Sequence, residues 1–287
     1  MSHILVVADL LDGNPVAMLK ASELAEQHGM PVKFVFFCHD NITHLDCDLE
    51  QMQADIISKV KERSEALLAE HVPADIEYSC EVVWEKRIHQ WVNRYVKENQ
   101  VSFVVKTGHR TETLMYTSTD WHLLRECEAP IYLSSEKQWR RSQHVLAAID
   151  LETKNEEKLA LNDKILAQAK DLAAASKSDL HVCYTVPFSR LLNDFGLQYK
   201  DEVEIKANKK LKPVIEALAN EHNIPLEHFH LKAGEPEKVI PSTAAKVKAA
   251  VVVLGIVGRK GLSGSIIGNT AEQILTLLKT DLLAIKP

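Results

Sequence analysis

The chain of 287 residues lacks the features of several specialised protein classes. It has no apolar run approaching the roughly 20 residues of a membrane-spanning helix, so we expect no membrane contact. Its five cysteines are odd in number and scattered, which favours reduced thiols in a cytoplasm over a disulfide framework. Basic residues number 34 against 40 acidic ones. The net charge of −6 argues against a nucleic-acid-binding protein, which normally carries a basic patch.

The hydrophobic content of 46% is that of a globular protein with an ample core, and the chain repeats itself. The segments ILVVADL (4–10) and VLAAIDL (145–151) match, and similar strands and helices follow each at a period of about 140 residues. The first residues lack a basic n-region and a cleavage site, so we interpret them as a strand and not a signal peptide. We predict two domains, 1–136 and 143–287, with a polar linker at 136–144.

Each half reads as five strands alternating with four helices. Continuous apolar strands between helices are typical of parallel pairing with both faces covered. We therefore predict the α/β class, with two tandem, doubly wound, five-stranded parallel-sheet sandwiches. The predicted strands are 4–10, 32–38, 76–83, 102–106 and 130–134, then 145–151, 180–186, 226–232, 250–254 and 281–286. The predicted helices are 14–28, 46–71, 85–98 and 119–127, then 154–177, 200–222, 236–248 and 269–279.

Glycine is scarce, but five of the ten glycines fall between 255 and 268, after the apolar run AAVVVL (249–254). Glycine lets backbone N–H groups approach a ligand closely, and a following helix start attracts an anion. In open α/β sheets, ligands bind beyond the carboxyl ends of the strands, where this loop and Asp150 both fall. The loop contains neither the P-loop nor the GxGxxG motif. It nevertheless predicts a phosphate site.

Gly255, Gly258 and Gly268, followed by the polar Asn269, have the spacing Gly-x2-Gly-x9-Gly. Together with Asp150 at a strand end, this pattern resembles the nucleotide-binding motif of the universal stress protein family, in its tandem two-domain type. The resemblance covers the whole chain. It implies an adenine nucleotide alpha-hydrolase-like fold, two halves packed as a pseudo-dimer, bound ATP with Mg²⁺, and a role in the stress response.

The resemblance also implies individual roles in the second half. Asp150 would face the adenosine, and Thr185 would offer main-chain contacts to the adenine. Leu254 and Gly255 would touch the ribose. The phosphates would be held by Gly258, Arg259, Gly268, Asn269 and Thr270. The family more often has serine or threonine at the position of Asn269.

The corresponding loop of the first half, TGHRTETLMYTSTDW (107–121), keeps only Gly108. Larger side chains replace the other glycines, and Glu112 adds negative charge. We therefore predict that the nucleotide loop of the first domain is degenerate and does not hold ATP. Its cleft is either closed or reshaped, in the second case for an apolar or lipid-like ligand.

No nucleophile, general base or arginine finger accompanies the glycine-rich loop. We therefore predict a cytoplasmic module that binds or senses ATP and is not an enzyme. A slow ATPase using the same pocket stays open as an alternative, as does a scaffold that has lost nucleotide binding. The expected partners are the adenine nucleotide and either a second copy or other stress proteins, but neither nucleic acid nor a membrane.

Several other residues have simpler interpretations. Asp9 is expected to cap its turn. Asp120 and His122 form a possible acid–base pair, but Asp120 is better explained as a helix start. We predict that Trp84 and Trp91, seven residues apart, anchor one helix in the core.

We predict no metal site, although two groups of residues permit one. His39, His44 and Cys47 are close in sequence but lack a typical ligand spacing. His228 and His230 would lie on one face of a strand, an arrangement that is common by chance.

Overall fold

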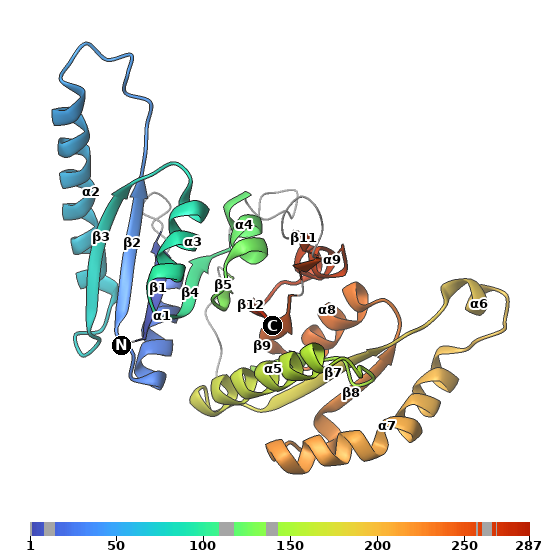
Figure 1. Cartoon of the computed structure of the whole chain (residues 1–287). Coiled ribbons are helices and arrows are strands. Elements are labelled where there is room, and N and C mark those ends of the chain that lie inside the picture. The colour runs from blue at the N-terminus through green and yellow to red at the C-terminus, as the bar shows by residue number, and fades with distance from the viewer. Residues whose placement is uncertain are drawn as a thin grey trace. The chain divides into compact units, whose positions relative to one another are not determined.

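The computed structural model describes residues 2–8, 15–108, 118–135, 143–256, 258–259, 266–267 and 269–287. The chain divides into two compact units, Met1–Gln138 and Trp139–Pro287. Figure 1 colours unit 1 from blue to green and unit 2 from green to red. Among the helices of the described ranges, none has the length and apolar composition needed to cross a bilayer.

Unit 1 contains a five-stranded sheet with the order β3-β2-β1-β4-β5, in which every neighbouring pair is parallel. Its elements are β1 (His3–Ala8), α1 (Val16–His28), β2 (Val32–Cys38), α2 (Leu49–His71), β3 (Tyr78–Trp84), α3 (Ile88–Glu98), β4 (Val101–Thr107), α4 (Ser118–Glu126) and β5 (Ile131–Ser134). The central strands β1 and β4 are buried because helices cover a parallel sheet on both faces.

Unit 2 repeats this topology with the order β12-β9-β6-β7-β8, again with parallel pairs. It begins with β6 (His144–Ala148), α5 (Glu156–Ala175), β7 (Leu180–Val186), α6 (Arg190–Asp194), α7 (Lys200–His222), the 3-10 helix η1 (Leu226–His228) and β8 (Phe229–Ala233). It continues with α8 (Pro236–Lys246), β9 (Ala249–Gly255), β10 (Gly258–Arg259), β11 (Ile266–Ile267), α9 (Asn269–Leu277) and β12 (Asp281–Ile285).

The predicted fold class is confirmed, because both units are doubly wound parallel sheets. In unit 2 the chain runs outward from β6 through β7 to β8, then returns to β9 on the other side of β6. This reversal creates a switch point between β6 and β9, where the loops after the two strands diverge and leave room for a ligand. Helices α5, α8 and α9 flank this place (Figure 1). How the two halves pack together stays a prediction.

Three local predictions were wrong. Trp84 is the last residue of β3 and does not share a helix with Trp91. The segment predicted as a strand from 226 starts as η1, so His228 lies in a tight turn and not on β8. The segment after β9 is not all loop, since β10 and β11 pair there as a short antiparallel hairpin. Asp9 lies outside the described residues.

Candidate functional site

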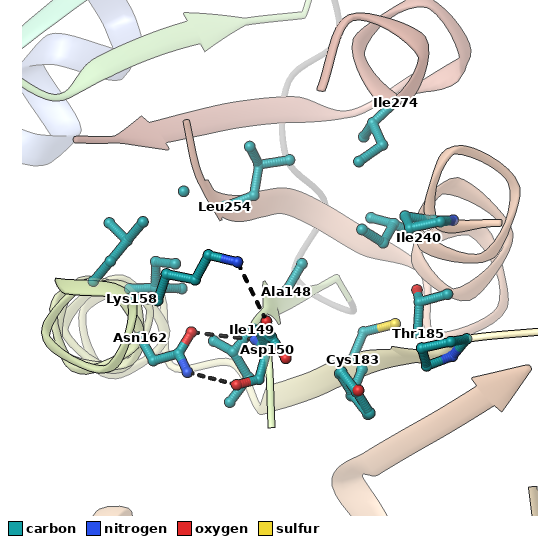
Figure 2. Close-up of a pocket in the computed structure, with 16 residues that line it drawn as sticks. Ala148, Ile149, Asp150, Lys158, Asn162, Cys183, Thr185, Ile240, Leu254 and Ile274 are labelled. Atoms are coloured by element: carbon teal, nitrogen blue, oxygen red, sulfur yellow. Dashed lines mark hydrogen bonds and ion pairs between the residues drawn. The ribbon is translucent and has the colours of Figure 1, made fainter. Parts of the chain in front are cut away.

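A cavity of about 520 Å³ opens at the carboxyl edge of the unit 2 sheet. This volume is within the range of about 300–1,000 Å³ that small-molecule sites usually have. The ends of β6, β7 and β9 form its floor, and side chains of α5, α8 and α9 form its walls (Figure 2). The cavity therefore lies at the switch point of the sheet.

Asp150 follows β6 and is fixed by its neighbours. Asn162 of α5 bonds the main chain of Asp150 twice: its side-chain amide donates to the carbonyl over 2.9 Å and its oxygen accepts from the N–H over 3.2 Å. The carboxylate Oδ1 accepts the N–H of Glu152 over 3.2 Å, a turn-capping contact. The other oxygen, Oδ2, lies 3.9 Å from Nζ of Lys158 at the cavity (Figure 2). The side chain thus caps a turn and still presents an oxygen to the cavity.

Thr185, in β7, also lines the cavity. Its hydroxyl Oγ1 is buried and has no hydrogen-bond partner among the described residues. An unsatisfied buried hydroxyl costs about 1–3 kcal/mol, so such groups usually mark a place where a ligand or water completes the bonding. The hydroxyl therefore offers a polar contact to a molecule in the cavity.

The remaining wall is largely apolar. Ile240 from α8, Leu254 from β9 and Ile274 from α9 face the cavity, and each is buried (Figure 2). Apolar walls with a few placed polar groups are typical of pockets that hold a flat ring.

Gly255 has a packing role that the sequence did not reveal. A Cβ at this position would lie 2.5 Å from Cδ2 and 2.9 Å from Cγ of Leu161 in α5, and 3.2 Å from Cδ1 of Ile165. Real Cβ atoms essentially never approach another heavy atom to under 3.0 Å. The glycine therefore allows α5 to pack against the end of β9, beside the cavity.

A polar network beside the cavity was also missed by sequence reasoning. The hydroxyl of Tyr184 donates to Oε2 of Glu152 over 2.7 Å, and Lys210 of α7 donates to Oε1 over 2.5 Å. The hydrogen bond from Lys210, and after it the one from Tyr184, holds the pKa of Glu152 below its usual value. Burial and the same carboxylate raise the pKa of Tyr184. The sequence spacing of these three residues does not predict the contact.

The structure thus brings four predicted residues together at one cavity, namely Asp150, Thr185, Leu254 and Gly255. The backbone of Gly258 and Arg259 forms β10, and Asn269 and Thr270 are the first two residues of α9. Gly268 lies outside the described residues.

Unit 1 carries different side chains at the corresponding strand end. The N–H of Gly108 donates to the carbonyl of Ser134 over 2.9 Å, just as the N–H of Ile256 donates to Ile285 over 2.8 Å in unit 2. Gly108 therefore matches Ile256, and Lys106, two residues earlier, matches Leu254.

The side chain of Lys106 is buried, and its Nζ lies 3.1 Å from Oδ1 of Asp120 in α4. Asp120 is the third residue of nine-residue α4, and Ala271 is the third of nine-residue α9. Unit 1 therefore has a buried ion pair at the positions where unit 2 has Leu254 and Ala271.

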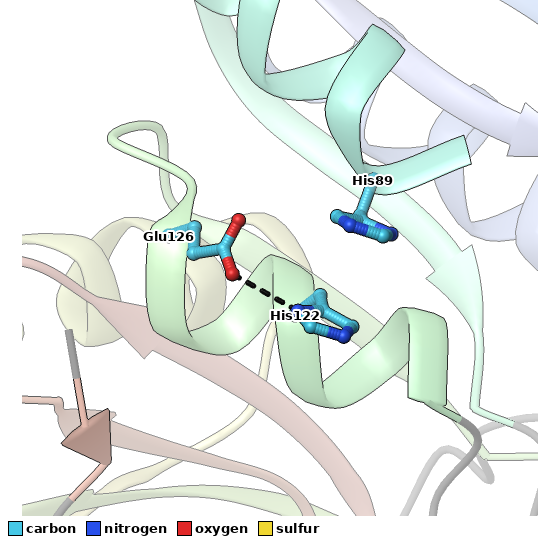
Figure 3. Close-up of side chains that lie close together, drawn as sticks. All are labelled: His89, His122 and Glu126. Atoms are coloured by element: carbon cyan, nitrogen blue, oxygen red, sulfur yellow. Dashed lines mark hydrogen bonds and ion pairs between the residues drawn. The ribbon is translucent and has the colours of Figure 1, made fainter. Parts of the chain in front are cut away.

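Asp120 and His122, the possible acid–base pair, contact different partners in the structure. A hydrogen bond of 2.9 Å joins Nδ1 of His122 to Oε1 of Glu126. The ring of His122 stacks on the ring of His89, with the ring centroids 4.0 Å apart (Figure 3). Burial and the neighbouring His122 lower the pKa of His89. One donor atom from each of His89, His122 and Glu126 lies within 4.8 Å of the others, a set of ligands that a metal ion could use.

Two tandem doubly wound units, the second with a cavity at its switch point, define the α/β class of tandem parallel-sheet proteins. The model of the universal stress protein family matches residues 1–134 and 142–286, and the chain belongs to this family. Universal stress protein E of Salmonella typhi is 31% identical over 99% of this chain and 94% of that protein. The homolog from Haemophilus influenzae is 26% identical over 99% of this chain and 97% of its own length.

Solved structures agree on the fold. A protein of unknown function from Pseudomonas aeruginosa PAO1 superposes with a TM-score of 0.71 and 25% identity, covering 100% of this chain and 93% of that one. A universal stress protein from Archaeoglobus fulgidus has a TM-score of 0.63 and 16% identity, covering 100% and 99%. The resemblance drawn from the glycine motif is therefore confirmed at the level of the family.

Proposed function

We propose that unit 2 binds ATP, with Mg²⁺, in the cavity at the ends of β6, β7 and β9, and that the protein acts in the cytoplasm as a binding or sensing module of the stress response. The observation that carries this proposal is the cavity at the switch point, lined by four residues of the family motif. The unpartnered hydroxyl of Thr185 supports a ligand with polar ring or sugar groups.

In this proposal the base lies against the apolar wall of Ile240, Leu254 and Ile274, with Thr185 as a polar contact. Asp150 contacts the sugar through Oδ2, the carboxylate oxygen that does not cap the turn. The phosphates extend toward the segment after β9, where the resemblance assigns them to Gly258, Arg259, Gly268, Asn269 and Thr270. Backbone N–H groups at the start of α9 favour negative charge there. Mg²⁺ would neutralise part of the charge of the phosphates when bound.

The chemistry of the described cavity residues supports binding without turnover. Burial raises the pKa of Cys183 to about 11, so its thiol is not ionised near neutral pH. The pKa of Tyr184 is raised as well, and its hydroxyl already donates to Glu152. Neither side chain is prepared to act as a nucleophile or base.

For unit 1 we propose that the corresponding pocket does not take ATP. The buried pair of Lys106 and Asp120 places two polar side chains where unit 2 has a leucine and an alanine. A nucleotide would have to separate this pair and leave the buried ammonium of Lys106 without its carboxylate, which is costly in a protein interior.

Calorimetric titration with ATP and Mg²⁺ tests the proposal on the full chain. The expected result is one site per chain, lost in Leu254→Lys/Ala271→Asp, which copies the ion pair of unit 1, and weakened in Thr185→Val. The exposed Thr43→Val serves as the matched control and should bind like the wild type. Absence of binding by the wild type would support the scaffold alternative. Phosphate release above that of Leu254→Lys/Ala271→Asp would support a slow ATPase.

A further inference from the structure

Four histidines of unit 2 gather at the amino ends of its strands, the edge of the sheet opposite to the cavity. His144 begins β6, His181 and His230 are the second residues of β7 and β8, and His228 ends η1. The first and last of them, His144 and His230, are 86 positions apart in the sequence. The parallel pairing of the three strands brings them together.

The strand register explains why these side chains share one face. Leu146 pairs with His181, and His144 precedes Leu146 by two residues. Cys183 pairs with His230, and His181 precedes Cys183 by two residues. Residues two apart in a strand point to the same face, so all three histidines project from the same side of the sheet.

The imidazoles are in direct contact. Nδ1 of His181 lies 3.0 Å from Nε2 of His230. The ring of His181 is 4.1 Å from that of His228 and 5.2 Å from that of His144. Nδ1 of His144 lies 3.3 Å from Oδ2 of Asp179, the residue just before β7. All four histidines are half-buried, whereas the carboxylate of Asp179 reaches solvent.

These separations match those between the ligands of one metal ion. One donor atom from each of His144, Asp179 and His181 lies within 4.8 Å of the other two. In a tetrahedral zinc site with metal–nitrogen distances of about 2.0–2.1 Å, neighbouring ligand atoms lie about 3.3–3.4 Å apart. The 3.3 Å between His144 and Asp179 already has this value.

The hydrogen bonds around the cluster prepare its nitrogens for a cation. The main-chain N–H of Asp179 donates to Nδ1 of His144 over a long 3.4 Å, so Nδ1 is unprotonated in this tautomer, and a metal ion at Nδ1 would replace this weak hydrogen bond. Two acceptors facing each other are stabilised by a cation between them. When Nδ1 of His181 donates to His230, Nε2 of His181 keeps a lone pair for a metal. A second hydrogen bond of this kind orients most metal-binding histidines.

We propose that His144, Asp179 and His181 form a binding site for a divalent transition-metal ion of the zinc type, with His230 as the positioning residue of His181. Imidazole nitrogens and one carboxylate oxygen suit this class of ion. The three protein ligands leave a fourth position open to solvent on the side of Asp179. The cations Lys246 and Lys232 near His230 act against the ion, whereas the carboxylate of Asp179 beside His144 favours it.

Zinc binding by the full chain, without a polyhistidine tag and after treatment with a chelator, tests the proposal at pH 7.5. Because His89, His122 and Glu126 are a second possible set of ligands, the background variant is His89→Gln/His122→Gln. Competition with a chromophoric chelator should show one zinc ion per chain in this background. His181→Gln should lose it, and Asp179→Asn should weaken it at least about tenfold. His44→Gln, an exposed histidine of unit 1, is the matched control and should bind like the background.

Two further readouts separate a metal site from a packed group of histidines. Zinc should raise the melting temperature of the background but not that of His181→Gln. The melting temperature without zinc shows whether each variant is folded. His230→Gln, which keeps all three ligands, should weaken zinc binding by about 10–100-fold because it frees the ring of His181. Failure of the background to bind zinc, or equal binding by the background and His144→Gln/His181→Gln, would refute the site. Either result leaves ATP binding at the opposite edge unaffected.

Discussion

The buried ion pair of unit 1 yields a quantitative prediction about the stability of this unit. Asp120→Ala removes the carboxylate 3.1 Å from Nζ of Lys106 and leaves an ammonium whose side chain is only 4% exposed. Among the described residues, Lys106 also donates to the carbonyl of Thr107 over 2.8 Å, and this carbonyl carries no full charge. Lys106 is therefore left without its ion-pair partner in the interior.

Removing one partner of such a pair typically costs about 3–5 kcal/mol, since a buried charge loses its compensation. Replacing both partners by apolar residues of suitable size is often neutral or stabilising. Unit 2 supplies the natural replacement, since Leu254 and Ala271 occupy the matching positions. We therefore expect Asp120→Ala to destabilise unit 1 by about 3–5 kcal/mol and Lys106→Leu/Asp120→Ala to recover most of that loss.

Urea unfolding followed by tryptophan fluorescence measures both variants. Trp84, Trp91 and Trp121 belong to unit 1, so the signal of these three reports mainly on its unfolding. With a slope of about 2 kcal/mol per molar urea, the single variant should shift the midpoint by roughly 1.5–2.5 M. A loss under about 1 kcal/mol, or a double variant as unstable as the single one, would refute the reasoning that the pair is buried and mutually compensating.

Three further predictions concern unit 2. Gly255→Ala should lower the free energy of unfolding by about 1–3 kcal/mol through the clash with Leu161, and adding Leu161→Ala should make the two effects less than additive in urea unfolding. Thr185→Val should stabilise the ligand-free protein by about 1 kcal/mol, because it removes a buried hydroxyl without a partner; a lower midpoint would contradict this. The pKa of Glu152 is lowered in the folded state, so its contribution is complete above the unfolded value of 4.5 and is lost as pH falls through the folded value. The stability difference between the wild type and Glu152→Gln should therefore shrink in acid, and a difference that is constant from pH 7 to 3 would show that the carboxylate contributes nothing.

Much of the fold could be predicted from the sequence, because long apolar strands and helices alternate regularly. The predicted strand 180–186 and helix 200–222 have the bounds of β7 and α7. The errors fall where the local signal is weak. The apolar residues after 225 predict one strand. The segment instead begins with the 3-10 helix η1, where the N–H of His228 donates to the carbonyl of Pro225. Short hairpins such as β10–β11 leave no periodicity in a glycine-rich stretch.

The candidate site was predictable to the extent that strand ends define it. Asp150, Thr185 and Gly255 follow from the rule that ligands bind at the carboxyl ends of parallel strands. Asn162 and Lys158 were not found, because a helix residue facing a cavity looks like any polar residue of an amphipathic helix. Partners that lie far apart in the chain, such as Glu152 and Lys210, become neighbours only through the packing of α7.

The two units show how side chains at a switch point can differ while the backbone stays the same. The hydrogen bond from the residue after the fourth strand to the last strand is kept in both units, at 2.9 Å in one and 2.8 Å in the other. The main chain at the switch point is thus conserved in geometry, and the difference resides in side chains. A lysine at this buried position is stabilised by the carboxylate opposite it, so Lys106 depends on Asp120. Converting the side chains of unit 1 to those of unit 2 therefore requires both substitutions, because Asp120→Ala alone leaves the buried ammonium of Lys106 without this carboxylate. The difference between the two switch points is thus one of electrostatics and needs no change of fold.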